Sequence, residues 1–100
     1  MRHFAGNEIL AILPNRQTQK SVREMIQEVS DTTGLSKTEI LDRSTRRRPI
    51  VRARQLVMWK AKQEGFSFPQ IGKALGGYDH TTVLHGVRKI DQLMAAAREE

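Results

Sequence analysis

The chain has 100 residues, of which 17 are lysine or arginine, 11 are acidic and none is cysteine. This length fits one small domain, and the absence of cysteine excludes disulfides and thiolate chemistry, which suits a reducing cytoplasm. The formal net charge of +6 favours a polyanionic partner, with nucleic acid the first choice and an anionic membrane surface the second.

Residues 1–17 are predicted to form a tail that is partly flexible, because glycine, asparagine and proline punctuate them. The longest apolar run near the N-terminus is Ile9–Leu13. A secretory signal needs about 7–15 apolar residues in a row and a membrane span about 20, so neither is expected. Residues 18–98 are predicted to form a single domain.

Two capping boxes mark the first helices of this domain. Ser21 and Glu24 have the spacing in which each side chain bonds the other residue's backbone N–H, and they favour a helix over residues 18–33. Ser36 and Glu39 repeat the pattern and begin a short second helix.

A strongly basic segment follows. Residues 43–48 have little to bury, which predicts a loop or arm, and Pro49 fits the first position of a third helix that runs to about Glu64. From Arg43 to Gln63 the chain carries eight basic residues and no acidic one. Arginines on a loop can enter the minor groove of DNA, and those at a helix start can hold phosphates, although a solvated surface is the plain alternative.

The last two helices form a helix-turn-helix pattern. A short helix is predicted over residues 67–75, a glycine turn over 76–78 and the longest helix over 79–95. Val83, Val87 and Ile90 recur at helical spacing and give the last helix one apolar stripe. No segment has the period of a strand, so we predict an all-α domain of about five helices.

The polar face at the start of the last helix can read DNA bases. Asp79 is a helix N-cap that can also accept a hydrogen bond from cytosine N4. His80 can donate to guanine, and the methyl group of Thr81 can pack on that of thymine. An ordinary polar helix start is the alternative interpretation.

Metal, nucleotide and catalytic sites are not expected. His80 and His85 are five residues apart, which separates them around a helix, and no cysteine or carboxylate cluster supports them as metal ligands. Gly72 and Lys73 resemble the end of a phosphate-binding loop, but the preceding glycine has the wrong spacing and Ala74 replaces the required hydroxyl. We therefore expect no cofactor and no enzymatic activity.

Residues from about 18 to 93 resemble the C-terminal DNA-binding domain of the bacterial replication initiator DnaA. The resemblance is carried by Arg46–Arg54, Ile71–Gly77 and Asp79–His85, and the stretch from Gly76 to His85 is highly specific to that family. It implies binding to duplex DNA at a DnaA box, an asymmetric A·T-rich site, in connection with the control of chromosomal replication initiation.

The resemblance also implies roles for individual residues. Those matching Asp79, His80 and Thr81 read bases in the major groove, and the arginine matching Arg46 reads the minor groove. Contacts to the DNA backbone are expected for Arg47, Arg48, Arg54, Gln55, Lys62, Phe68, Thr82 and His85.

The chain departs from the family pattern in three ways. Tyr78 occupies a position that is often arginine, and we expect its side chain to be exposed on the turn. The loop at Gly65 and Phe66 looks about one residue short. The ATPase and N-terminal interaction domains are missing, so we expect no ATP binding, and the chain is either a free-standing paralogue or a fragment.

Other functions remain open at this stage. The chain could be a transcriptional regulator or a non-specific nucleoid-type DNA-binding protein, or a basic adaptor that meets an acidic protein. We expect a monomer on DNA, located in the cytoplasm at the nucleoid, with no membrane or nucleotide partner.

Overall fold

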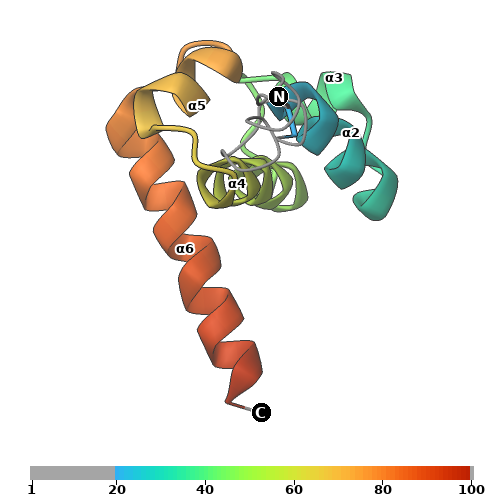
Figure 1. Ribbon diagram of the computed structural model, residues 1–100. Coiled ribbons are helices and arrows are strands. Elements are labelled where there is room, and N and C mark those ends of the chain that lie inside the picture. The colour runs from blue at the N-terminus through green and yellow to red at the C-terminus, as the bar shows by residue number, and fades with distance from the viewer. Residues whose placement is uncertain (1–19, 100) are drawn as a thin grey trace, which may run out of the picture.

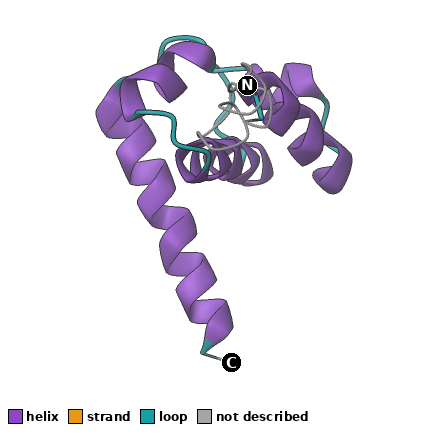
Figure 2. Ribbon diagram, viewed as in Figure 1, coloured by secondary structure: helices purple, strands orange, loops and turns teal. Residues whose placement is uncertain are grey.

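The computed structural model describes residues 20–99, so the tail predicted over residues 1–17 lies outside the described residues. This range contains no strand and consists of helices joined by short loops and turns (Figures 1 and 2). They are α2 (Val22–Thr33), α3 (Lys37–Leu41), α4 (Arg48–Gln63), α5 (Phe68–Ala74) and α6 (His80–Arg98). The predicted all-α class is confirmed, and the helix ends differ from the predicted ones by a few residues.

Reciprocal capping boxes begin three of these helices. In each box a serine hydroxyl accepts a hydrogen bond from the backbone N–H three residues later, and the side chain of that later residue accepts one from the serine N–H. The pairs are Ser21 with Glu24, Ser36 with Glu39, and Ser67 with Gln70. These bonds satisfy N–H groups that have no partner within the helix, so local sequence fixes where each helix starts.

Helix α4 lies at the centre of the domain and packs against α2, α3, α5 and α6 (Figure 1). Apolar side chains from all of these helices form the core. The largest fully buried ones are Met25, Ile40, Met58, Ile71 and Leu75. Trp59 and Phe68 are half-buried against this core. The Trp59 indole also donates from Nε1 to Asp91 Oδ1 at 2.9 Å, which ties α4 to α6.

Helix α6 packs closely on α4 over its first half and then leaves the domain. A Cβ at Gly86 would lie 2.6 Å from Met58 Sδ, so glycine permits the close approach. Residues 91–99 are exposed, including Leu93 and Met94, and the helix extends away from the other helices (Figure 1). In the range that the structure describes, no helix is both long and apolar enough to span a membrane.

Candidate nucleic-acid interface

The turn between α5 and α6 is held directly on α5. Gly76 and Gly77 have φ angles of 108° and 104°, a region that favours glycine. The Gly72 carbonyl accepts hydrogen bonds from the backbone N–H groups of Gly77 and Tyr78, at 2.9 and 3.0 Å. A Cβ at Gly72 would lie 2.1 Å from the Tyr78 carbonyl oxygen, so this approach requires glycine. The turn therefore fixes where α6 begins.

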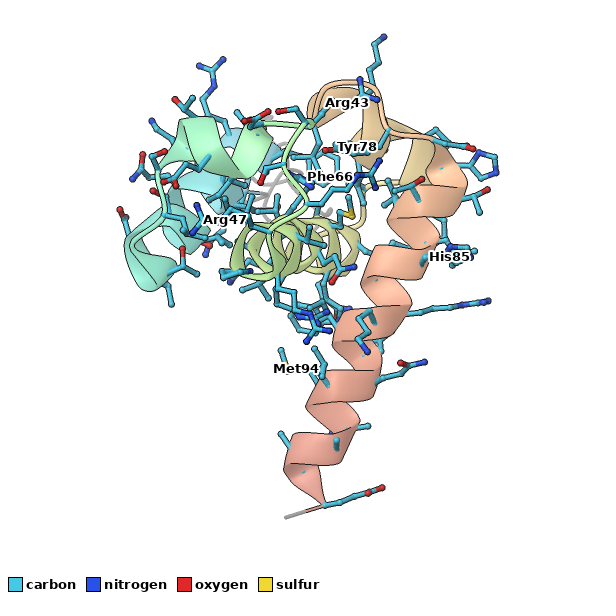
Figure 3. The ribbon with its side chains drawn as sticks, turned by 180° about the vertical axis from the view of Figure 1, so that it is seen from behind. Arg43, Arg47, Phe66, Tyr78, His85 and Met94 are labelled. Atoms are coloured by element: carbon cyan, nitrogen blue, oxygen red, sulfur yellow. The ribbon has the colours of Figure 1, made fainter. Side chains whose placement is uncertain are left out.

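The first turn of α6 presents polar side chains to solvent. Asp79 is the N-cap, and its Oδ1 accepts a hydrogen bond from the Thr81 N–H at 3.4 Å. The side chains of Asp79 and His80 are 68% and 64% exposed, and their Oδ1 and Nδ1 atoms lie 3.1 Å apart. Thr81, Thr82 and His85 are also exposed, and His85 lies on the outer face of α6 (Figure 3). This face can therefore meet a ligand without rearrangement of the core.

The arginine loop, defined as residues 42–47, has its own internal bonds. Asp42 Oδ1 accepts hydrogen bonds from the Ser44 hydroxyl at 2.6 Å and the Ser44 N–H at 2.9 Å. These two bonds, with a smaller contribution from the nearby Arg54 charge, lower the pKa of the Asp42 carboxyl from its ordinary value of 3.8. Arg46 is exposed on this braced loop, and Arg48 is exposed at the start of α4.

Arg54 lies mostly inside the protein, at 7% exposure. It donates from Nε to the Ile40 carbonyl at 3.0 Å and from Nη2 to the Asp42 carbonyl at 2.6 Å. These bonds fasten the end of α3 and the start of the loop to α4. The predicted phosphate contact of Arg54 stays a prediction, because its principal contacts are with the protein itself.

Tyr78 is half-buried and packs against the hydrophobic core, so the expectation that it is exposed was wrong. Its ring contacts two guanidinium groups, those of Arg43 and Arg54, at 4.9 and 5.6 Å from the ring centroid. Sequence reasoning did not assign Arg43 to the interface. The only sign of its role in the sequence was its position at the start of the basic segment. Its partners could not be predicted locally, because they are more than 30 residues away in the chain.

The arginine loop and the start of α6 line one hollow, whose volume is about 570 Å³. Arg43 and Arg46 contribute from the loop, Arg54 from α4, Tyr78 from the turn and Thr82 from the start of α6. The structure thus brings together two basic and polar segments that the sequence separates. A strongly basic hollow of this kind can accommodate the phosphates of a nucleic acid.

The remaining predicted residues do not line this hollow. Lys62 Nζ lies 4.5 Å from the centroid of the Phe68 ring, which places its charge beside the N-terminus of α5. Gln55 accepts a hydrogen bond from Arg52 Nη1 at 2.7 Å. Arg47 lies on the side of α2 and α3 rather than beside α6 (Figure 3). Its charge contributes there to a lowered pKa of Glu39, behind the larger effect of hydrogen bonds from Ser36.

Comparison with known families agrees with this geometry. The family described as the bacterial DnaA protein helix-turn-helix matches residues 22–90. The chain belongs to this family. The match includes the arginine loop, α4, α5, the turn and the first half of α6.

Individual DnaA proteins are similar over nearly the whole chain. The chromosomal replication initiator protein DnaA of Thermus thermophilus is 36% identical over 99 residues, which is 98% of this chain and 22% of that protein. Those of Rhizobium meliloti and Caulobacter vibrioides are 43% and 39% identical over 90% and 89% of this chain, and 19% of each relative is covered. The chain thus spans about a fifth of the length of these relatives. No solved structure gave a significant match.

Proposed function

We propose that this chain is a sequence-specific duplex-DNA-binding module that recognises DnaA-box-like sites and takes part in the control of chromosomal replication initiation. The observation that carries the proposal is the shared hollow, in which an arginine loop and the exposed start of a helix-turn-helix recognition helix lie together. Membership of the DnaA helix-turn-helix family and the net charge of +6 support the same function.

In this proposal the first turn of α6 enters the major groove. Asp79, His80 and Thr81 are exposed and short enough to reach base edges, where each good contact contributes on the order of 1–3 kcal/mol of discrimination. Arg46 enters the adjacent minor groove, where a narrow A·T-rich segment concentrates negative potential. The two elements therefore read neighbouring grooves of a single site.

The remaining cations and polar groups hold the DNA backbone in this proposal. Thr82 lines the hollow, His85 lies one turn further along α6, and Lys62 with the backbone amides near Phe68 holds a phosphate at the start of α5. Arg48 and Gln55 contact the backbone from α4. Arg47 and Arg54 act less directly, because the first lies away from α6 and the second is buried. The module binds as a monomer at the nucleoid and needs no nucleotide.

A salt series on two duplexes tests the proposal. One duplex carries a DnaA box and the other a scrambled version of the same composition, and fluorescence anisotropy gives both dissociation constants. Salt weakens both complexes, because the logarithm of the binding constant falls with the logarithm of the salt concentration, with a slope of about −0.9 for each phosphate contact. The preference for the box should nevertheless persist. That preference should be roughly 1,000-fold or more.

Equal affinity for the two duplexes would identify a non-specific nucleoid-type protein, and no tight binding at moderate salt would favour a protein-interaction adaptor. A matched pair of variants locates the contact. Arg46→Ala should lose roughly tenfold in affinity for the box, or about 1.4 kcal/mol, which is within the range of roughly 1–3 kcal/mol for one good base contact. Arg23→Ala removes the same charge from an exposed position on α2, outside the hollow, and should change the affinity much less.

A further inference from the structure

Aromatic and polar contacts join the arginine loop to the turn of the helix-turn-helix (Figure 3). The Arg43 guanidinium lies 4.9 Å from the centroid of the Tyr78 ring and donates from Nη1 to the Gly76 carbonyl at 2.9 Å. The Arg54 guanidinium lies 5.6 Å from the same centroid. Both cations are attracted to the electron-rich ring, so Tyr78 holds a loop residue and an α4 residue together.

The same contacts connect both DNA-reading elements to the core. Arg54 binds the carbonyls of Ile40 and Asp42, which fixes the start of the loop to α4. The Tyr78 N–H binds the Gly72 carbonyl, and Tyr78 directly precedes the α6 N-cap. The arginine loop therefore reaches the turn before α6 in two ways, through the Tyr78 ring and through the hydrogen bond from Arg43 to the Gly76 carbonyl.

Building on the function proposed above, we propose that Tyr78 is a positioning residue that sets the distance between the arginine loop and the first turn of α6. Arg43 is its partner on the loop. Held in this way, Arg46 and Asp79–Thr81 meet the minor and major grooves as one unit. A preorganised pair loses less conformational entropy on binding than two elements that move independently.

The ring of Tyr78, rather than its hydroxyl, performs this role. The hydroxyl oxygen is buried and has no hydrogen-bond partner among the residues that the structure describes. Tyr78→Phe removes only that hydroxyl and keeps the surface on which both guanidinium groups lie. Tyr78→Leu keeps an apolar side chain, shorter than that of tyrosine, but removes the ring. Comparison of the two variants separates the hydroxyl from the ring, and Arg43→Gln, which leaves the ring in place, separates the cation contact from simple filling of space.

The first test measures the distance in the DNA-free protein. Because the chain has no cysteine, Arg46→Cys and Thr81→Cys place two spin labels without further changes. Pulsed electron paramagnetic resonance then gives the distribution of distances between the loop and α6. Tyr78→Leu and Arg43→Gln should broaden this distribution, whereas Tyr78→Phe should leave it as narrow as in the parent.

A second pair of labels, at Lys62→Cys and Thr81→Cys, reports the packing of α4 against α6 and should be unchanged in every variant. An unchanged Arg46–Thr81 distribution in Tyr78→Leu overturns the proposal. Equal broadening of both label pairs also overturns it, because the ring would then be an ordinary core residue. Neither outcome depends on DNA binding.

The second test uses DNA footprinting. Tyr78→Leu should bind the box duplex roughly fivefold more weakly, in line with the usual value of a partly desolvated cation–aromatic contact. The loss should fall on minor-groove protection from hydroxyl radicals, while major-groove protection of guanine N7 from dimethyl sulfate remains. Tyr78→Phe should keep the affinity and the minor-groove protection of the parent. Arg43→Gln should lose minor-groove protection as Tyr78→Leu does, and Lys37→Gln is its control because it removes one charge elsewhere. Equal loss of both protections contradicts the proposal.

The two tests also separate the positioning role from the proposed function. If the parent protein does not prefer the box duplex but the spin-label distances respond as expected, the proposed function is wrong and the positioning role of Tyr78 still holds.

Discussion

At the scale of single residues, the proposed interface depends on the side chains that α6 exposes at its start. The His80 side chain is 64% exposed, and its Nδ1 lies 3.1 Å from Oδ1 of its neighbour Asp79. We predict that His80→Ala keeps the fold and loses discrimination at particular base pairs, by on the order of 1–3 kcal/mol. Competition binding with a set of single-base-pair variants of the box measures this. Unchanged discrimination at every position would show that His80 does not read a base.

Arg54 illustrates the opposite case, a basic residue whose function is inside the protein. Arg54→Ala leaves the Ile40 and Asp42 carbonyls without their present partner, so we predict a loss of roughly 2 kcal/mol in the free energy of unfolding. Urea denaturation measures the change. Arg48→Ala is the control, because it removes an exposed arginine and should change stability by less than about 0.5 kcal/mol. Equal stability of the two variants would argue that the buried bonds contribute little.

At the scale of elements, the helix starts depend on capping boxes, and one of them should respond to pH. Hydrogen bonds from Ser36 hold the pKa of Glu39 below its ordinary 4.5. A lowered folded-state pKa means that the carboxylate stabilises α3 above that ordinary value and loses its contribution as the pH falls through the folded value. Glu39→Gln keeps the box, as Gln70 does with Ser67, but cannot titrate.

We therefore predict that the stability difference between the parent and Glu39→Gln shrinks from about pH 6 to about pH 3, when both are followed by urea denaturation. A difference that stays constant over this range would mean that the Glu39 charge does not contribute to the box.

The elements also show what local sequence can and cannot predict. Capping serines, the glycine pair at the turn and the apolar spacing along α6 act within a few residues, so the sequence was sufficient to predict all five helices and the helix-turn-helix in the described range. The burial of Tyr78 and Arg54 was not predicted. Their environments are created by residues that lie far away in the chain, and a turn aromatic or a basic run gives no local sign of burial.

At the scale of the whole molecule, the domain places its arginine loop and the start of α6 on one hollow and extends α6 beyond the core. Residues 95–99 are exposed, so we predict that a chain ending at Met94 unfolds with a free energy within about 0.5 kcal/mol of the parent. Thermal and urea denaturation test this. A larger loss would reveal a structural role for the end of α6.

The most direct test of the central claim is selection of bound duplexes from a random pool, followed by footprinting of the selected sequence. We predict enrichment of one asymmetric, A·T-rich element that resembles a DnaA box, with protected positions in adjacent major and minor grooves. The minor-groove protection should disappear in Arg46→Ala, and the major-groove protection should weaken in His80→Ala. A pool that stays unenriched after repeated selection, although the protein binds DNA, would contradict sequence-specific recognition by this domain.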